Sequence, residues 1–513
     1  MGERPAGRRL RIALLVAVGL LCIYGLVLAH YRAKVNAVVG SIAAAGEPTC
    51  VKDLLQAPVS AGDNAAGLCR EAAQITKRHA NVPFGLPFRA SSAAPPSVTW
   101  RDLLREPAAF AKAVKDHLIP RAGMMAPPSG GTPAVSVGYG MYNPSNVLHL
   151  EFLSEFIEAD ARALELLNTA ADRPLCRFAI DPEKYPQALM RPLADMRQLA
   201  RFLSAAGIVA SHQGHQEVAF ERLRMGFALS RHTAQQPAGM SLLVAGAIDE
   251  IMHKAAEYVL GHGPTPEKAA RSLATELSRL DYLDCFEQGA RGDRALGLEL
   301  YREMRTRPVA SLSRLQPAYA GPIPFTRKVS RWVMAKPLAA LLYADQLEYL
   351  RLKQELIDHA RRPWRDSVDY CTRESKETAE FASRSLMTRS PKSTLAKRYM
   401  KRDRAIARRA MLRAALGLKA YHDRFGEYPS ALSDLEQVNW SVPEDIFSGK
   451  PLSYRCDGDR FVLYSVGADL RDDGAAIVAS PAGGSTVRVG PFEVRAGDIL
   501  WTWRDGRPGS AGP

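Results

Sequence analysis

Residues 146–167 read NVLHLEFLSEFIEADARALELL, and the apolar side chains of this stretch recur at intervals of three, four and seven. They are Leu150, Leu153, Ile157, Leu164 and Leu167. Because an α-helix turns once in 3.6 residues, this spacing brings all of them to one helical face. The stretch therefore predicts a helix with one face packed on a core, and it opens a helical region that extends to residue 383.

The same periodicity continues downstream, with almost no alternating strand pattern before residue 430. Further helices are predicted at 193–211, 216–231, 240–260, 266–280 and 337–360. Thr265, Pro266 and Glu267 form a helix start, because threonine caps free amides, proline suits the first turn and an acid favours the positive helix end. We predict a mainly α fold in which residues 146–383 form an irregular helical domain.

Small residues within this domain indicate one tight helix pair. Gly207, Gly214, Ala219 and Gly226 fall at offsets that resemble the small-residue positions of a tetratricopeptide hairpin. A tetratricopeptide array needs about three or more repeats of ~34 residues, and no second copy follows at that period. A single helical hairpin inside an irregular bundle is therefore expected.

Upstream, residues 12–29 (IALLVAVGLLCIYGLVLA) contain no charge. As a helix they would span roughly 27 Å, near the thickness of a bilayer core. Four arginines and a single acid precede them, which favours residues 1–11 as a cytoplasmic basic tail. We predict a single-pass anchor in the inner (cytoplasmic) membrane, with the C-terminal bulk outside the cytoplasm. The alternative is a cleaved signal peptide, whose apolar region usually has only about 7–15 residues.

Residues 30–145 predict a broken, helical, membrane-proximal region. Proline-rich patches at 82–96 and 120–144 act as loops or linkers, and a helix is expected between them at 97–119.

Six cysteines lie outside the span: Cys50, Cys69, Cys176, Cys285, Cys371 and Cys456. An even number in a compartment where disulfides persist predicts one to three bridges, and Cys50 with Cys69 is the most local pair. Buried free thiols are the alternative, because six cysteines allow 15 pairings.

The charge of the chain is concentrated in one segment. Lys and Arg outnumber Asp and Glu by 68 to 54, yet between Arg384 and Arg413 the only acid is Asp403. An apolar stripe in the same segment predicts a basic amphipathic helix over 384–425. Its candidate surface cations are Arg404, Arg408 and Arg409.

These cations would dock on anionic lipid headgroups or on an acidic protein partner, and a solvated helix face is the alternative reading. Nucleic acid is disfavoured by the expected compartment. It is also disfavoured because the segment lacks interleaved aromatic residues on which bases would stack.

Strand-forming residues predict a strand at 460–466 and a closing strand at 497–503. The basic helix ends in Tyr421, Gly426, Tyr428 and Pro429, and the first of these strands ends in residues 463–467 (LYSVG) before an acidic loop. Over roughly residues 405–475 this order of motifs resembles the globular C-terminal part of the major pseudopilin of type II secretion. The resemblance implies that residues 426–513 form a small α+β, β-rich module. It also implies that Asp469, Asp472 and Asp473 hold calcium, an ion that prefers oxygen ligands. A polar turn with capping aspartates is the alternative.

The chain departs from a pseudopilin because it lacks the prepilin-peptidase junction and carries the matching helix far from its N-terminus. Packing into a filament is not expected. The whole chain instead resembles bacterial envelope proteins in which an anchor and a helical domain precede such a module.

The sequence lacks local catalytic motifs. It contains no GxSxG, no Walker-type phosphate loop and no HExxH, and acidic pairs such as Asp249 and Glu250 fit solvated or capping positions. We expect a protein-binding or scaffolding role, linked to secretion or surface assembly, rather than catalysis. The alternative is an envelope hydrolase whose catalytic residues converge from distant helices, so enzyme activity stays open.

Overall fold

The computed structural model describes residues 5–54, 59–80, 147–181, 187–306, 339–384, 394–458, 460–475, 486–489, 492–495 and 497–501. The helix expected at 97–119 and both proline-rich patches, at 82–96 and 120–144, lie outside these residues.

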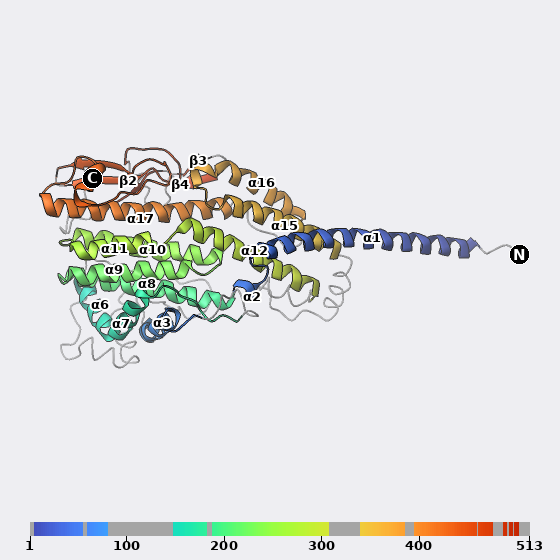
Figure 1. Cartoon of the computed structure of the whole chain (residues 1–513), viewed down its shortest axis with the longest axis horizontal. Coiled ribbons are helices and arrows are strands. Elements are labelled where there is room, and N and C mark those ends of the chain that lie inside the picture. The colour runs from blue at the N-terminus through green and yellow to red at the C-terminus, as the bar shows by residue number, and fades with distance from the viewer. Residues whose placement is uncertain are drawn as a thin grey trace, which may run out of the picture.

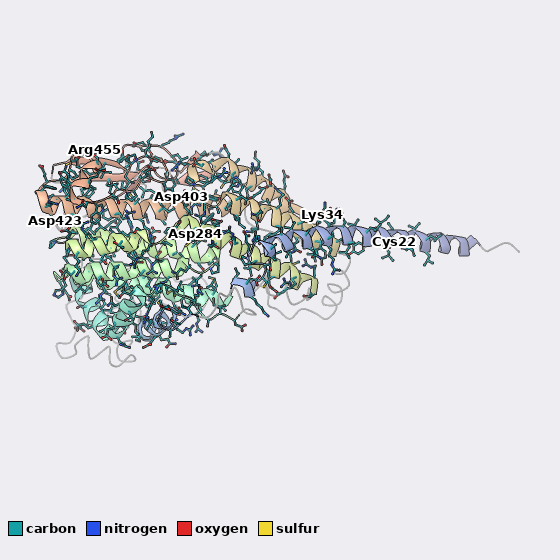
Figure 2. All side chains as sticks on the ribbon, in the orientation of Figure 1. Cys22, Lys34, Asp284, Asp403, Asp423 and Arg455 are labelled. Carbon is teal, nitrogen blue, oxygen red and sulfur yellow. The ribbon has the colours of Figure 1, made fainter. Side chains whose placement is uncertain are left out.

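The predicted span belongs to a longer helix, α1 (Pro5–Ala44), which projects from one end of the body (Figure 1). Leu14, Leu20 and Leu26 on the projecting part are 63–71% exposed. Figure 2 shows Cys22 on this part and Lys34 where the helix reaches the body. Among the described helices, α1 is the one long and apolar enough to cross a membrane, a property that an anchor and a signal sequence share.

Beyond the span, α1 continues into the body without a break. Ile42 is buried against side chains of α12 (Tyr282–Thr306) and α15 (Ala339–His359). Glu47, just after α1, forms ion pairs with Arg291 and Arg294 of α12. The C-terminal part of α1 is therefore packed into the folded body rather than joined to it by a linker.

The body is a bundle whose centre is built from α8 (Gln187–His212), α9 (Gln216–Ala234) and α10 (Gly239–Gly261). The expected hairpin is α8–α9, and it turns at Gly214, whose φ is +81°. Gly207 lets the two helices approach, since a Cβ there would lie 3.5 Å from Arg222 Cβ. The prediction of a tight helical pair at this place is confirmed.

The opening stretch forms two helices rather than one. α6 (Val147–Ala159) and α7 (Ala161–Asp172) meet at Asp160, which is fully buried. Three helices that the periodicity did not single out also appear: α3 (Ala66–Ala80), α12 and α16 (Val368–Arg384). A short helix, α2 (Val51–Leu54), follows α1, and α11 (Glu267–Ser278) lies between α10 and α12.

The basic segment is a central helix and not a surface one. α17 (Thr394–Phe425) packs on α10, α11 and α12, and also on the short helices η3 (Trp364–Asp366) and η4 (Leu432–Val438) and on strand β2. Because α17 carries apolar residues on more than one stripe, it is covered on both sides. The expectation of an amphipathic helix with one free cationic face is corrected accordingly.

A small antiparallel sheet of order β1-β2-β5 lies beyond α17 (Figure 1). Its strands are β1 (Ser453–Asp457), β2 (Arg460–Ser465) and β5 (Ile499–Leu500). The strand predicted at 460–466 and the closing strand predicted at 497–503 pair in it, with Tyr464 opposite Leu500. A second hairpin, β3 (Thr486–Val489) and β4 (Phe492–Arg495), was not predicted.

One apolar core extends from Ala65 to Trp501 and includes residues of α3, α8, α10, α17 and the sheet. The indole nitrogen of Trp364 donates to the Ala468 carbonyl at 2.9 Å and joins η3 to the loop after β2. The helical body and the C-terminal module are thus packed on a common interior.

Candidate functional site

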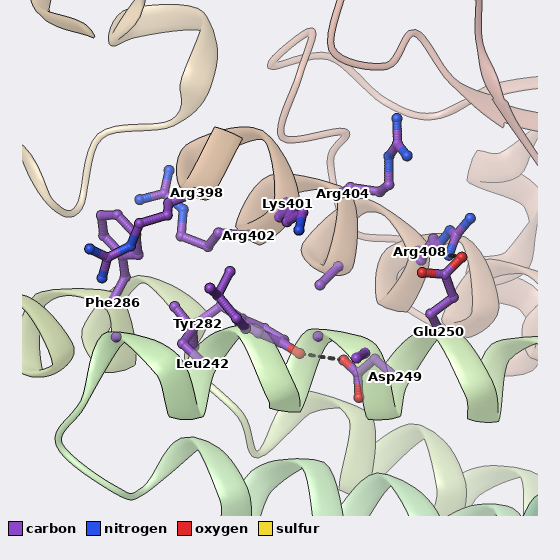
Figure 3. A pocket seen from close by; sticks show the side chains of 15 residues that line it. Leu242, Asp249, Glu250, Tyr282, Phe286, Arg398, Lys401, Arg402, Arg404 and Arg408 are labelled. Carbon is purple, nitrogen blue, oxygen red and sulfur yellow. Dashed lines mark hydrogen bonds and ion pairs between the residues drawn. The ribbon is translucent and has the colours of Figure 1, made fainter. Parts of the chain in front are cut away.

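A half-open cavity of about 170 Å³ lies between α10, α12 and α17 (Figure 3). One wall is basic and comes from α17: Arg398, Lys401, Arg402, Arg404 and Arg408. The facing wall comes from α10, with Leu242, Asp249 and Glu250, and α12 adds Tyr282 and Phe286. The cavity thus combines an apolar surface with a row of cations.

Small residues of α10 leave this space open. A Cβ added at Gly246 would have no atom within 4 Å, and Ala247 beside it also lines the cavity. The cations of α17 follow at intervals of three and four residues, so successive turns of that helix present them to the same opening. The cavity is therefore a consequence of short side chains facing long, charged ones.

A buried ion pair forms the floor. Asp249 receives two hydrogen bonds from Arg409, at 2.6 and 2.8 Å, and a third from the Tyr282 hydroxyl at 2.7 Å. Arg409 also donates to the Leu277 carbonyl at 3.0 Å. Burial opposes the charged guanidinium, but the Asp249 carboxylate outweighs this effect, so the pKa of Arg409 lies above its ordinary value. Both charges are satisfied internally.

Three further cations of α17 have carboxylate partners. Arg402 binds Asp403 at 2.6 Å and is buried, Arg398 binds Asp293 at 3.1 Å, and Arg408 binds Glu250 at 3.3 Å. Half-burial works against the Glu250 carboxylate, yet Arg408, Lys254 and Arg404 together lower its pKa. These pairs fix the walls of the cavity.

The rim keeps an excess of positive charge. Among the residues that line the cavity, five are basic and two are acidic. Lys401 is exposed and forms no hydrogen bond or ion pair with any residue that the structure describes. Arg404 lies half-buried at the same rim. This arrangement suits an anionic group arriving from solvent.

The lining consists of acidic, basic, aromatic and small or apolar residues. None of its residues is a histidine, serine or cysteine. Burial, followed by the Asp249 charge, raises the pKa of Tyr282 well above its ordinary value, so its hydroxyl keeps its proton. A volume of about 170 Å³ equals five or six waters at ~30 Å³ each, whereas small-molecule sites measure ≈ 300–1,000 Å³. The cavity accommodates one carboxylate- or phosphate-sized group.

The predicted surface cations are only partly brought together. Arg404 and Arg408 line the rim, but Arg409 is 4% exposed and is committed to Asp249. Arg409 therefore cannot touch a membrane surface, and we withdraw it from the surface set. The prediction that Asp249 occupies a solvated or capping position is wrong, because Asp249 is 2% exposed and ion-paired with Arg409. Its spacing from Leu242, Ala245 and Met252 puts this acid on the core face of α10.

The acidic loop near the sheet uses its carboxylates locally. Asp469 accepts a hydrogen bond from the Gly497 amide at 2.8 Å, and Asp472 accepts one from the Tyr464 hydroxyl at 2.9 Å. The Asp473 amide donates to Asp498. Across the described residues, no three His, Cys, Asp or Glu side chains are grouped to hold a metal ion. Calcium at Asp469, Asp472 and Asp473 stays a prediction without support from this geometry.

All seven cysteines are free thiols in the structure. The expected bridge between Cys50 and Cys69 is not formed, and Cys69 instead lies in the apolar core together with Cys176.

Comparison of the chain with protein-family models, with curated proteins and with solved structures gives no match. The pseudopilin resemblance of residues 405–475 stays a prediction, and the candidate site is argued from its own geometry.

Proposed function

We propose that the chain is a single-pass, membrane-anchored envelope protein whose helical body lies outside the cytoplasm and binds an acidic segment of another protein. The binding site is the basic cavity between α10, α12 and α17. The observation that carries this proposal is Lys401, which is exposed at the basic rim and has no hydrogen-bond or ion-pair partner among the described residues. In the proposal, the partner's carboxylate enters the cavity and completes the charge balance.

The size and lining of the cavity favour a macromolecular partner over a small substrate. The cavity accommodates one acidic side chain of a partner. The remaining contacts of a protein partner would lie on the surface of the helical body outside the cavity. Apolar walls from Leu242 and Phe286 lower the local dielectric, which strengthens an ion pair formed there. The cavity thus serves as an anchoring point within a larger interface.

The position of the cavity favours a protein over the headgroups of the anchor's own bilayer. Arg305, in the last turn of α12, lies near Arg32. Burial has the largest effect in lowering the pKa of Arg305, and the charge of Arg32 is among the smaller effects that lower it. Arg32 directly follows the span. Phe286 lies nineteen residues earlier on α12, about 28 Å along the helix axis. Screening removes most of a headgroup's attraction beyond about 8–10 Å.

The pseudopilin resemblance favours a partner among envelope proteins of secretion or surface assembly. This part of the proposal depends on the C-terminal module, which packs directly on α17, the helix that supplies the cations. A partner that binds at the cavity would therefore contact α17, the helix on which the module packs.

The test is site-specific photo-crosslinking of the full chain in its membrane. A photoreactive residue at Ala247, which lines the cavity, should yield a crosslinked protein, whereas one at exposed Val218 on α9 should not. Lys401→Gln together with Arg404→Gln should abolish the Ala247 adduct, and Arg162→Gln, which removes one positive charge from exposed α7, should not. An adduct with lipid alone, or an adduct unaffected by the double variant, would overturn the proposal.

A further inference from the structure

Two cysteines distant in sequence meet in the core. Cys69 lies in the first turn of α3, and Cys176 follows α7. Both are buried in one apolar core, at 2% and 0% exposure, and the neighbouring Cys69 thiol, together with burial, raises the pKa of Cys176. The other described cysteines have no thiol partner of this kind in the structure.

The backbone around the two cysteines holds them in register. The Ala65 amide donates to the Leu175 carbonyl at 2.8 Å, and the Leu175 amide donates to the Asp63 carbonyl at 3.2 Å. Asn64 adds two side-chain bonds to the backbone of Arg177, at 2.9 and 3.0 Å. The start of α3 is thus tied to the residues on both sides of Cys176.

Cys176 is also fixed from the side of α9. Its amide donates to the side-chain oxygen of Gln235 at 2.9 Å, and its carbonyl accepts a hydrogen bond from Gln236. Arg231 holds the preceding residues by donating to the Ala171 carbonyl at 3.0 Å. A disulfide requires roughly 4.4–6.8 Å between Cα atoms, and these bonds hold the backbone on both sides of Cys176 beside the start of α3.

One of the two residues borders a cavity. Cys69 lines a cavity of about 340 Å³ between α3 and α8, whereas Cys176 does not. The same cavity is lined by Arg70, Arg191 and Lys77, of which Lys77 is ion-paired with Asp195 at 2.5 Å, so Arg70 and Arg191 would attract an anionic disulfide such as oxidised glutathione. A disulfide oxidant therefore reaches Cys69 first.

We infer that Cys69 and Cys176 are an oxidisable pair that forms a disulfide when a disulfide oxidant, such as an oxidised thiol–disulfide oxidoreductase, enters this cavity. The sulfur of Cys69 attacks the oxidant's disulfide, forms a mixed disulfide and releases one thiol, which takes the Cys69 proton. The sulfur of Cys176 then attacks Cys69 Sγ and releases the second thiol, which takes the Cys176 proton. The pair loses two electrons, and the oxidant's disulfide gains them.

Oxidation would lock α3 onto the segment between α7 and α8. The covalent link closes a chain loop of more than a hundred residues, and long loops gain most from such a link because their unfolded state is most restricted. Only the occurrence of the link in the cell rests on the proposed extracytoplasmic location. The chemistry itself needs neither a membrane nor a partner, so its failure and that of the proposed function are distinguishable.

The test uses the purified full chain in detergent, equilibrated with oxidised or reduced glutathione, then denatured and alkylated. After oxidation the chain should lose two of its seven reactive thiols, and non-reducing peptide mapping should recover Cys69 linked to Cys176. Cys69→Ser and Cys176→Ser should each abolish the link, and Cys50→Ser should leave it intact. The oxidised wild type should also melt at a higher temperature than the reduced form, a difference that Cys69→Ser removes.

Seven alkylated thiols after oxidation, or Cys69 linked to Cys50, would overturn the inference. Peptide mapping of the wild type decides this even where a serine variant fails to fold.

Discussion

Asp249 is the residue that holds the floor of the cavity, because it is the buried counter-charge of Arg409 and also receives the Tyr282 hydroxyl. Asp249→Asn keeps the shape and removes the charge, so Arg409 would be left as an uncompensated buried cation. We expect a loss of about 3–5 kcal/mol in the free energy of unfolding. Denaturant unfolding of the full chain measures it.

The matched control is Glu250→Gln, one residue away, because Glu250 is half-exposed and bonds Arg408 at 3.3 Å. Exposed pairs contribute about 0–1 kcal/mol. Equal losses for the two variants would contradict the assignment of Asp249 as the buried partner.

His232 gives the body an acid-sensitive core. It is fully buried and bonded to the Ala170 carbonyl at 2.9 Å, and burial together with nearby Arg231 lowers its pKa to about 3. Above pH ~6.5 the ring is neutral in both states. Below pH ~6.5 this histidine binds a proton in the unfolded chain but stays neutral in the folded chain. The free energy of unfolding therefore decreases by about 1.4 kcal/mol for each unit of falling pH, until pH ~3.

His232→Gln, which keeps a donor for Ala170, should therefore lose less stability than the wild type between pH 7 and pH 5, by about 2 kcal/mol. Melting curves at the two pH values measure the difference. His215→Gln, at an exposed position, should behave like the wild type, and a His232→Gln curve that also matches the wild type would refute this account.

Single residues of the site were only partly predictable. Arg404 and Arg408 stand out because basic residues dominate their segment. Arg409 was wrongly predicted to be a surface cation, because its charge alone does not show whether another helix supplies a buried carboxylate partner. Asp249 was assigned to a solvated or capping position for the same reason, since its partner lies 160 positions away.

At the scale of elements, glycines decide where helices can touch. Gly246 on α10 faces open space, whereas a Cβ at Gly292 on α12 would overlap the Pro237 carbonyl. Gly246→Ala should raise the free energy of unfolding by roughly 0.5–1 kcal/mol, because alanine favours a helix interior. Gly292→Ala should lower it. A stability loss in Gly246→Ala would show that the cavity wall is closed.

Helices were predictable where apolar residues recur in a clean period, as in α8–α11 and α15. α12 escaped because Gly289, Gly292 and Gly297 weaken its helical signal and because its buried face carries Arg294. Whether α17 is a surface helix or a buried one depends on what packs against the side that faces away from α10. That information lies in the sheet and in η4, and no local pattern in α17 contains it.

At the scale of the whole molecule, the helix that would cross the membrane, α1, also packs on α12 and α15. The orientation of α1 in the membrane therefore decides on which side the folded body lies. The positive charges before the span favour a cytoplasmic N-terminus. A C-terminal alkaline phosphatase fusion should be active, and a C-terminal fusion to a reporter that folds only in the cytoplasm should be inactive. The reverse pattern would contradict the proposed topology.

The most direct test of the central claim is titration of a labelled octaglutamate peptide with the full chain in nanodiscs made of neutral lipid. The wild type should bind, and its affinity should fall as salt rises. Lys401→Gln with Arg404→Gln should weaken binding about tenfold or more, since two charges worth about 1 kcal/mol each are lost. Arg162→Gln should bind like the wild type. Equal affinity of the wild type and the double variant would contradict an acidic-ligand site between α10, α12 and α17.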